Sequence, residues 1–151
     1  MSALTQLALM HGDAQLSEAL RYGFEREGAT VHSAGDASEL EEALNKGAQV
    51  VITGFDDADA AKGALETIGE VMRGRQVERS VLYVGNGISR EAALDAGATE
   101  FLGHPAYVRD VVTLAALLTE RADPHRKSIC GELSEHFGVF YLVRALSAVQ
   151  R

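Results

Sequence analysis

The stretch Val50–Gly54 constrains the fold of this chain more than any other part of the sequence. It is a short run of mainly β-branched apolar residues that stops at a glycine, with turn signals close on both sides. Such a run is typical of a strand buried on both faces of a parallel sheet. Binding sites in open α/β sheets lie just past the carboxyl ends of such strands. Because Gly54 has no side chain for chemistry, the neighbouring strand ends decide which functions remain open.

The composition is that of one globular domain, with or without an appendage. The chain has 151 residues, of which 46% are hydrophobic, so it can form a sizeable core. Its formal net charge of −8 argues against non-specific nucleic-acid binding, which needs clustered Lys and Arg, and we expect no nucleic-acid partner. Cys130 is the only cysteine, which excludes an internal disulfide and a cysteine metal cluster.

The sequence also lacks the signals of secretion and of membrane insertion. Residues Met1–Met10 have neither a basic region nor a long apolar core, so they do not resemble a signal peptide. No apolar run is long enough to span a membrane. We therefore expect a cytoplasmic protein with no membrane partner.

Four more apolar runs of similar length predict further strands. Each is bounded by glycine or by polar turn residues. The predicted strands are Gln6–Met10, Ala29–Ser33, Val50–Thr53, Ser80–Val84 and Thr99–Leu102.

Amphipathic stretches between these runs predict helices, and several have recognisable ends. Asp13 is a good N-cap and Gly28 a good C′ residue for the first helix. Asp36 and Glu39 form a capping-box pattern for the second helix, which ends at Gly47. The predicted inner faces are Leu16, Ala19, Leu20 and Phe24; Leu40, Ala43 and Leu44; Ala61, Ala64, Leu65, Ile68 and Met72; and Val108, Val111, Val112, Ala115 and Leu118, while Ser89 caps a short helix through Ala96.

Five strands alternating with five helices predict a doubly wound α/β fold with a parallel sheet. Short connections and right-handed crossovers leave few topologies. We expect the flavodoxin-like strand order 2-1-3-4-5, which places Val50–Thr53 between the first and fourth strands. A Rossmann dinucleotide fold is excluded because His11-Gly12-Asp13 is not a glycine-rich phosphate loop.

Several segments, in order and spacing, carry a resemblance to a known family. In the stretch Ala96–Pro105, a Gly-Ala pair precedes the fifth strand and His104-Pro105 ends it. This stretch resembles the receiver domain of bacterial response regulators, in which a Lys-Pro pair stands at that end. The resemblance covers about Gln6 to Leu118 and implies a receiver-like domain over residues 1–122. It also implies a cis peptide bond between His104 and Pro105.

The residues that carry receiver chemistry are replaced in this chain. Where receivers have a magnesium-binding acidic pair, this chain has His11 and Gly12, and Gly54 stands at the place of the aspartate that accepts phosphate. Gly85 replaces the hydroxyl residue and His104 the lysine. Magnesium needs oxygen ligands and phosphoryl transfer needs a nucleophile with charge compensation, and glycine supplies neither. The resemblance therefore implies a pseudo-receiver without a catalytic site, metal or cofactor.

An alternative interpretation uses the polar residues that remain at the same rim. His11, Asp13, Asp56, Asn86 and His104 are candidates for a metal- or small-ligand-binding sensor site. Each also has a structural interpretation: Asp13 as an N-cap, Asp56 and its neighbour Asp57 as helix-terminal acids, Asn86 as part of a glycine-rich turn. The two imidazoles equally fill the space that the lost acids leave.

Residues 123–151 predict a linker and a C-terminal helix. Asp123–Lys127 is polar and contains a proline, and a helix is expected from about Ser134 to Arg151. The Gly-x-Leu step at Gly131–Leu133 resembles the opening of a PATAN-type domain, which would make this segment the start of a second domain. Otherwise it is an extra helix packed on the body. Its apolar face consists of Val139, Phe140, Leu142, Val143, Leu146 and Val149.

Two classes of function follow from the sequence. We expect a non-catalytic module of bacterial signal transduction that binds other signalling proteins independently of phosphorylation. The ligand-binding sensor is the alternative. An enzyme is not expected, because no nucleophile–base pair has supporting spacing. The apolar face of the C-terminal helix leads us to expect a homodimer.

Overall fold

The computed structural model describes residues 4–73, 75, 79–103 and 106–122, and in it the chain forms the predicted five-stranded sheet. All neighbouring strands are parallel, and their order is β2-β1-β3-β4-β5. The flavodoxin-like order 2-1-3-4-5 is therefore confirmed. The strands are β1 (Gln6–His11), β2 (Thr30–Ser33), β3 (Val50–Gly54), β4 (Ser80–Val84) and β5 (Glu100–Leu102).

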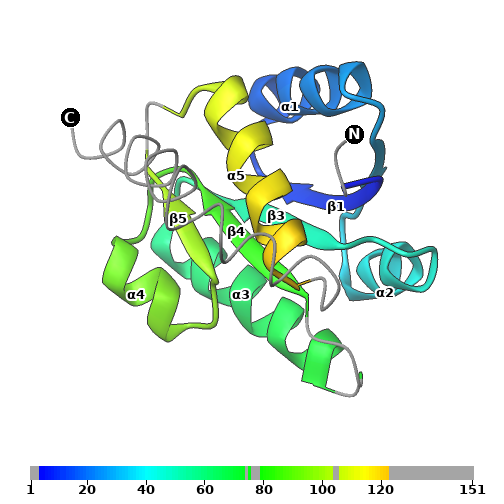
Figure 1. The fold of residues 1–151 in the computed structure, drawn as a ribbon. Helices are drawn as coiled ribbons and strands as arrows, with labels where there is room; N and C mark the ends of the chain where they lie inside the picture. The colour runs from blue at the N-terminus through cyan, green and yellow to red at the C-terminus, as the bar shows by residue number, and fades with distance from the viewer. Residues whose placement is uncertain (1–3, 74, 76–78, 104–105, 123–151) are drawn as a thin grey trace.

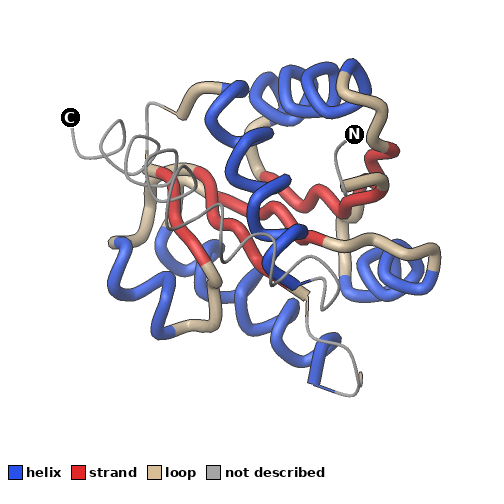
Figure 2. The backbone as a smooth tube through the Cα atoms, viewed as in Figure 1, coloured by secondary structure: helices blue, strands red, loops and turns tan. Residues whose placement is uncertain are grey.

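Helices cover both faces of this sheet (Figure 1). Two of them pack on one face with Leu7, Leu9 and Ile52, and the other three pack on the opposite face with Ala8 and Val51. Figure 2 shows the strands between these two helical layers. None of the described helices has the length and apolarity that a membrane span requires. On the first face lie α1 (Ala14–Arg26) and α5 (Val108–Ala122), and on the second α2 (Ala37–Asn45), α3 (Ala58–Arg73) and α4 (Arg90–Asp95).

The helix boundaries follow the local signals in the sequence. The Asp13 carboxylate accepts the backbone N–H groups of the first turn of α1, and Asp36 and Ser89 cap α2 and α4 in the same way. At the end of α1, Gly28 has a φ of 91°, a conformation that suits glycine. The Ala29 N–H then bonds the Phe24 carbonyl, which closes a Schellman motif.

Three predicted helix faces differ in part from the structure. Met72 of α3 and Val108 and Val112 of α5, which we expected on the buried faces, are only partly buried, and the clearest difference is in α1. In α1, Leu20 and Phe24 are buried, but Leu16 is only partly buried and Ala19 is exposed. The reason is that α1 contacts the sheet and α5 mainly through its second half, so the apolar periodicity of its first half does not correspond to a buried face. The other strand and helix positions agree with the prediction to within a few residues.

The centre of the sheet extends further than predicted, and this extension positions the candidate site. We expected β1 to end at Met10 and β3 at Thr53, but each strand has one more residue, and His11 pairs with Gly54. The Gly12 N–H then donates to the Gly54 carbonyl at 2.8 Å. Every residue of β3 is buried, as its apolar sequence predicts for a central strand. The pairing of β1 with β3 therefore continues to the carboxyl edge of the sheet, where the candidate site lies.

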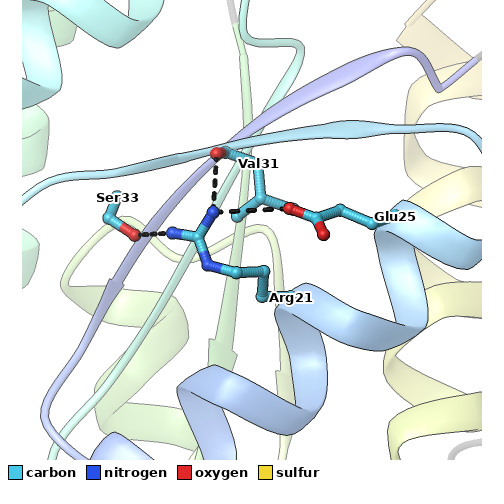
Figure 3. Close-up of polar contacts among 4 residues, drawn as sticks. All are labelled: Arg21, Glu25, Val31 and Ser33. Carbon is cyan, nitrogen blue, oxygen red and sulfur yellow. Dashed lines mark hydrogen bonds and ion pairs between the residues drawn. The ribbon is translucent and has the colours of Figure 1, made fainter.

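Arg21 of α1 protects the exposed edge of the sheet at β2. Its guanidinium donates to the Val31 carbonyl at 3.3 Å and to the Ser33 hydroxyl, and it lies 3.5 Å from the Glu25 carboxylate (Figure 3). β2 pairs only with β1, so its outer side offers unpaired backbone groups to other chains. Arg21 occupies one of these groups.

Two other predictions concern residues that the structure does not describe. The predicted cis bond between His104 and Pro105, and the linker and helix predicted over 123–151, lie outside the described residues.

Arg21→Ala is expected to lower the free energy of unfolding by about 0.5–1.5 kcal/mol, because the side chain is half-exposed and its hydrogen bonds are partly replaced by water. Arg21→Lys should restore only part of this, since an ammonium lacks the planar fork that reaches two acceptors. Urea denaturation measures both values. Arg73→Ala, an exposed arginine at the end of α3, is the control, and an equal loss there would contradict the edge assignment.

Candidate functional site

The carboxyl ends of β1, β3 and β4 lie side by side and form the candidate site. The register pairs His11 with Gly54, and Val84 ends the strand on the other side of Gly54. This is the edge where open α/β sheets place their ligands. We expected His11, Gly54 and Gly85 at this edge of the sheet, and the fold brings all three together.

Gly54 has no room for a side chain. A Cβ built on this residue would lie 1.8 Å from the Val84 carbonyl oxygen and 2.6 Å from His11 Nε2. The first of these contacts is with the backbone, so a change of side-chain rotamer cannot relieve it. The residue is also fully buried within the central strand. The side-chain position at the end of β3 is thus closed by the packing of its neighbours.

The side chain of His11 fills the space above Gly54 and connects β1 to β4. Its Nε2 lies 2.6 Å from the Val84 carbonyl oxygen, and the Asp13 backbone N–H donates to its Nδ1 at 3.0 Å. A backbone N–H can only donate, so Nδ1 accepts and the neutral ring carries its proton on Nε2. Both ring nitrogens therefore have partners in the protein. Of the two interpretations of His11, a ligand for a metal or a side chain that fills space, the geometry favours the second.

Gly12 is exposed, but a side chain there would also meet a neighbour, less rigidly than at Gly54. A Cβ at Gly12 would lie 2.5 Å from the nearest ring carbon of Phe55. The obstacle is a side chain and not backbone, so a larger residue at position 12 would require the Phe55 ring to shift. The aromatic ring therefore occupies part of the rim in place of an acidic group.

The turn after β4 begins with a glycine in an unusual backbone conformation. Gly85 is buried and has a φ of 140°, which L side chains rarely adopt. Its N–H donates to the Leu102 carbonyl at 2.9 Å, which ties this turn to β5. A Cβ at Gly85 would lie 3.8 Å from His11 Nε2, an ordinary contact distance. The backbone conformation, rather than space, selects glycine here.

A buried tyrosine, Tyr83, holds the loops around the site. Its sequence context gave no sign of this role. The Tyr83 hydroxyl accepts the Phe55 N–H at 3.1 Å and lies 2.7 Å from the carbonyl oxygens of both Phe55 and Asn86. It has one proton, so it donates to one of these carbonyls at a time. Its ring stacks on Phe101 with centroids 5.6 Å apart. Tyr83 thus links the loops that follow β3 and β4.

Burial raises the pKa of Tyr83 above its ordinary value of 10.0. The backbone hydrogen bond with Phe55 acts in the opposite direction, and the nearby negative charge of Asp56 raises the pKa again. The net direction is upward, so the folded protein favours the neutral hydroxyl that the two loops require.

The other candidate rim residues have structural roles or point into solvent. Asp13 accepts N–H groups of α1, and Asp57 accepts the Ala60 N–H at 3.0 Å at the start of α3. Asp56 and Asn86 are exposed. His104 lies outside the described residues. Within the described part of the chain, no three His, Cys, Asp or Glu side chains are close enough together to hold a metal ion.

Comparison with solved structures identifies the fold. A two-component response regulator from Clostridium difficile is 14% identical, with a TM-score of 0.64 over 79% of this chain and 98% of that one. A CheY-like protein, TadZ, from Pseudomonas aeruginosa is 20% identical, with a TM-score of 0.63 over 76% and 98% of the two chains. The receiver domain of the TMAO respiratory system response regulator TorR is 18% identical, with a TM-score of 0.64 over 79% and 99%.

These likenesses confirm that the chain has the fold of response-regulator receiver domains. At such low identities they establish the fold alone. No protein-family model and no curated protein sequence matches the chain.

Gly54→Ala is expected to lower the free energy of unfolding by about 1–3 kcal/mol or more, because the added methyl group overlaps the Val84 backbone. Gly63→Ala is the matched control. Gly63 is exposed in the middle of α3, and nothing lies within 4 Å of a Cβ built on it, so the change should stabilise the fold by about 0.5–1 kcal/mol. Thermal and urea unfolding measure both. If Gly54→Ala is as stable as the parent chain, the site is not closed.

Tyr83→Phe is expected to cost about 1–3 kcal/mol, because it leaves the Phe55 N–H and a buried carbonyl without their partner. The pH dependence follows from the raised pKa of Tyr83. Stability from the neutral hydroxyl is fully present below the unfolded pKa of about 10 and is lost as the pH rises through the folded pKa.

Alkaline unfolding curves of Tyr83→Phe and of the parent chain check this sign. The parent should lose stability more steeply above pH ~10. Tyr22→Phe, which changes an exposed tyrosine, should follow the parent curve. A parent curve parallel to that of Tyr83→Phe would show that Tyr83 makes no pH-dependent contribution.

Proposed function

We propose that this chain is a pseudo-receiver that acts in bacterial signal transduction through protein contacts and without phosphorylation. One observation carries the proposal: the space that a phosphate-accepting side chain would need at Gly54 is occupied by the Val84 carbonyl and by the His11 ring. The receiver fold is present, while the position of its chemistry is packed with protein atoms.

The nearby carboxylates do not replace the missing acceptor. Asp57 is engaged as the cap of α3, and Asp13 is engaged as the cap of α1. Asp56 is exposed and follows the strand end, where its side chain is not held against the sheet edge. Phosphoryl transfer to a carboxylate needs a magnesium ion held by several oxygen ligands, and His11 and Gly12 supply none from their side chains. These features support a module that neither accepts phosphate nor catalyses a reaction.

The same geometry argues against the ligand-binding sensor. Both nitrogens of His11 are used within the protein, so this imidazole would have to give up a bond to the Val84 carbonyl or to the Asp13 N–H before it could bind a metal. We therefore retain the interaction module as the proposed function. Its partners are other signalling proteins, and the homodimer through the apolar face of residues 139–149 belongs to this proposal.

The intact mass of the full chain after incubation with acetyl phosphate and magnesium tests the proposal. We expect no added phosphoryl group, because no acceptor is held at the site. A receiver domain that is known to accept phosphate, treated in parallel, controls for the reagent. A stoichiometric adduct that maps to Asp56 or Asp57 would show that the chain is a working receiver with a displaced acceptor.

A further inference from the structure

A groove between α1 and α5 is a surface feature of the described residues whose role the proposed function leaves open. It has a volume of about 680 Å³ and lies on the face of the sheet opposite to α2, α3 and α4. Its base includes the buried residues Leu4, Phe24 and Ala29, and polar residues such as Arg109 and Glu120 lie along it. The groove is open enough and apolar enough to accept several aliphatic side chains.

Gly23 brings the two walls of the groove together. A Cβ on this residue would lie 2.5 Å from Cγ1 of Val108 and 3.5 Å from Cγ2 of Val112. Glycine in a helix interior is destabilising relative to alanine. Here the glycine allows α1 to approach α5 closely. The neighbouring residue Tyr22 is 68% exposed. The groove thus has a tightly packed wall and an exposed aromatic rim.

The α5 wall has more apolar surface than the core of the sheet uses. The core contacts are made by Val111, Leu114, Ala115 and Leu118. A second stripe, Val108, Val112 and Ala116, follows at a spacing of four residues and lines the groove together with Leu117. A surface helix usually has one apolar stripe about 100° wide, and a helix that is apolar over most of its circumference is normally covered. The second stripe of α5 is covered only in part: Val108 and Val112 also pack against the core, and the stripe as a whole stays partly exposed along the groove.

The chain itself provides a segment with the matching property. Directly after α5 it continues to Arg151, and the predicted helix from Ser134 carries the apolar face Val139, Phe140, Leu142, Val143, Leu146 and Val149. The predicted linker, residues 123–133, can extend over roughly 35 Å, whereas the whole of α5 is about 22 Å long. The helix can therefore reach the groove from the end of α5 in either orientation.

We propose that the α1–α5 groove is the docking site of residues 134–151, which insert their apolar face against Val112, Ala116 and Leu117. One contact would then remove from water both the partly exposed stripe of α5 and the predicted apolar face of the segment, which is favourable. This docking goes beyond the pseudo-receiver proposal: it concerns the face of the sheet remote from the strand ends, and it holds whether or not the chain accepts phosphate.

Thiol reactivity in the full chain tests whether the groove is covered. In a Cys130→Ser background the chain has no other thiol, so Ala116→Cys introduces a single reporter in the groove. We expect slow alkylation of this thiol, compared with the thiol of Ala60→Cys on the exposed surface of α3. Adding Leu146→Asp should raise the rate at position 116 towards that at position 60.

Ala148→Asp is the matched control for this change, because position 148 lies on the opposite side of the predicted helix from Leu146. It should leave the rate at position 116 low. Equal rates at positions 116 and 60 in the parent background would overturn the proposal. So would a low rate at position 116 that Leu146→Asp does not change, since the groove would then be covered by something else.

Disulfide formation identifies the occupant independently of the aspartate variants. Ala116→Cys combined with Leu142→Cys, Val143→Cys or Leu146→Cys should lose its free thiols on mild oxidation in at least one pair, since a disulfide needs Cα atoms within about 7 Å. The same changes combined with Ala60→Cys should not. Links within one chain and links between two chains both place the segment in the groove, and the second result would identify the expected homodimer. No link above the position-60 control would overturn the proposal.

Discussion

The contact between three neighbouring strand ends determines what this receiver-like fold can do. His11 crosses over Gly54 and approaches the Val84 carbonyl at 2.6 Å, and this crossing is possible only because Gly54 has no Cβ. The absence of a side chain at Gly54 and the position of the imidazole are therefore one structural fact. A carboxylate at position 54 and His11 in its present rotamer exclude each other, because the same space would hold both. The site is better described as filled than as empty.

The loops around the filled site are held by hydrogen bonds of buried groups. The Tyr83 hydroxyl joins the backbones of Phe55 and Asn86, and the Gly85 N–H joins the Leu102 carbonyl. A buried hydroxyl that accepts one N–H and donates to one carbonyl favours a single loop arrangement, because most alternatives leave polar groups unpaired. Such a fixed arrangement would give the proposed interaction module a constant surface for its partners.

The fold could be predicted from the sequence because its signals are local. The apolar run of β3, the caps at Asp13 and Asp36 and the glycine at the end of α1 each determine a few residues, and their order gives the sheet. The filling of the site depends on which strand ends are neighbours. The sequence showed that Gly54 lacks a carboxylate, but only the register shows that His11 lies beside it. Tyr83 was missed because it stands in an apolar strand, where the pattern indicates a core residue and gives no sign of a hydroxyl with three backbone partners.

The most direct test of the filled site is an NMR titration of the full chain with magnesium and beryllium fluoride, which together mimic a phosphorylated aspartate. If the site is packed as described, the amide signals of Gly12, Gly54 and Gly85 do not move, and the His11 ring keeps its proton on Nε2. Saturable shifts at Gly54 and Gly85 would contradict the account, because they would show that the strand ends still open to a metal and a phosphate analogue.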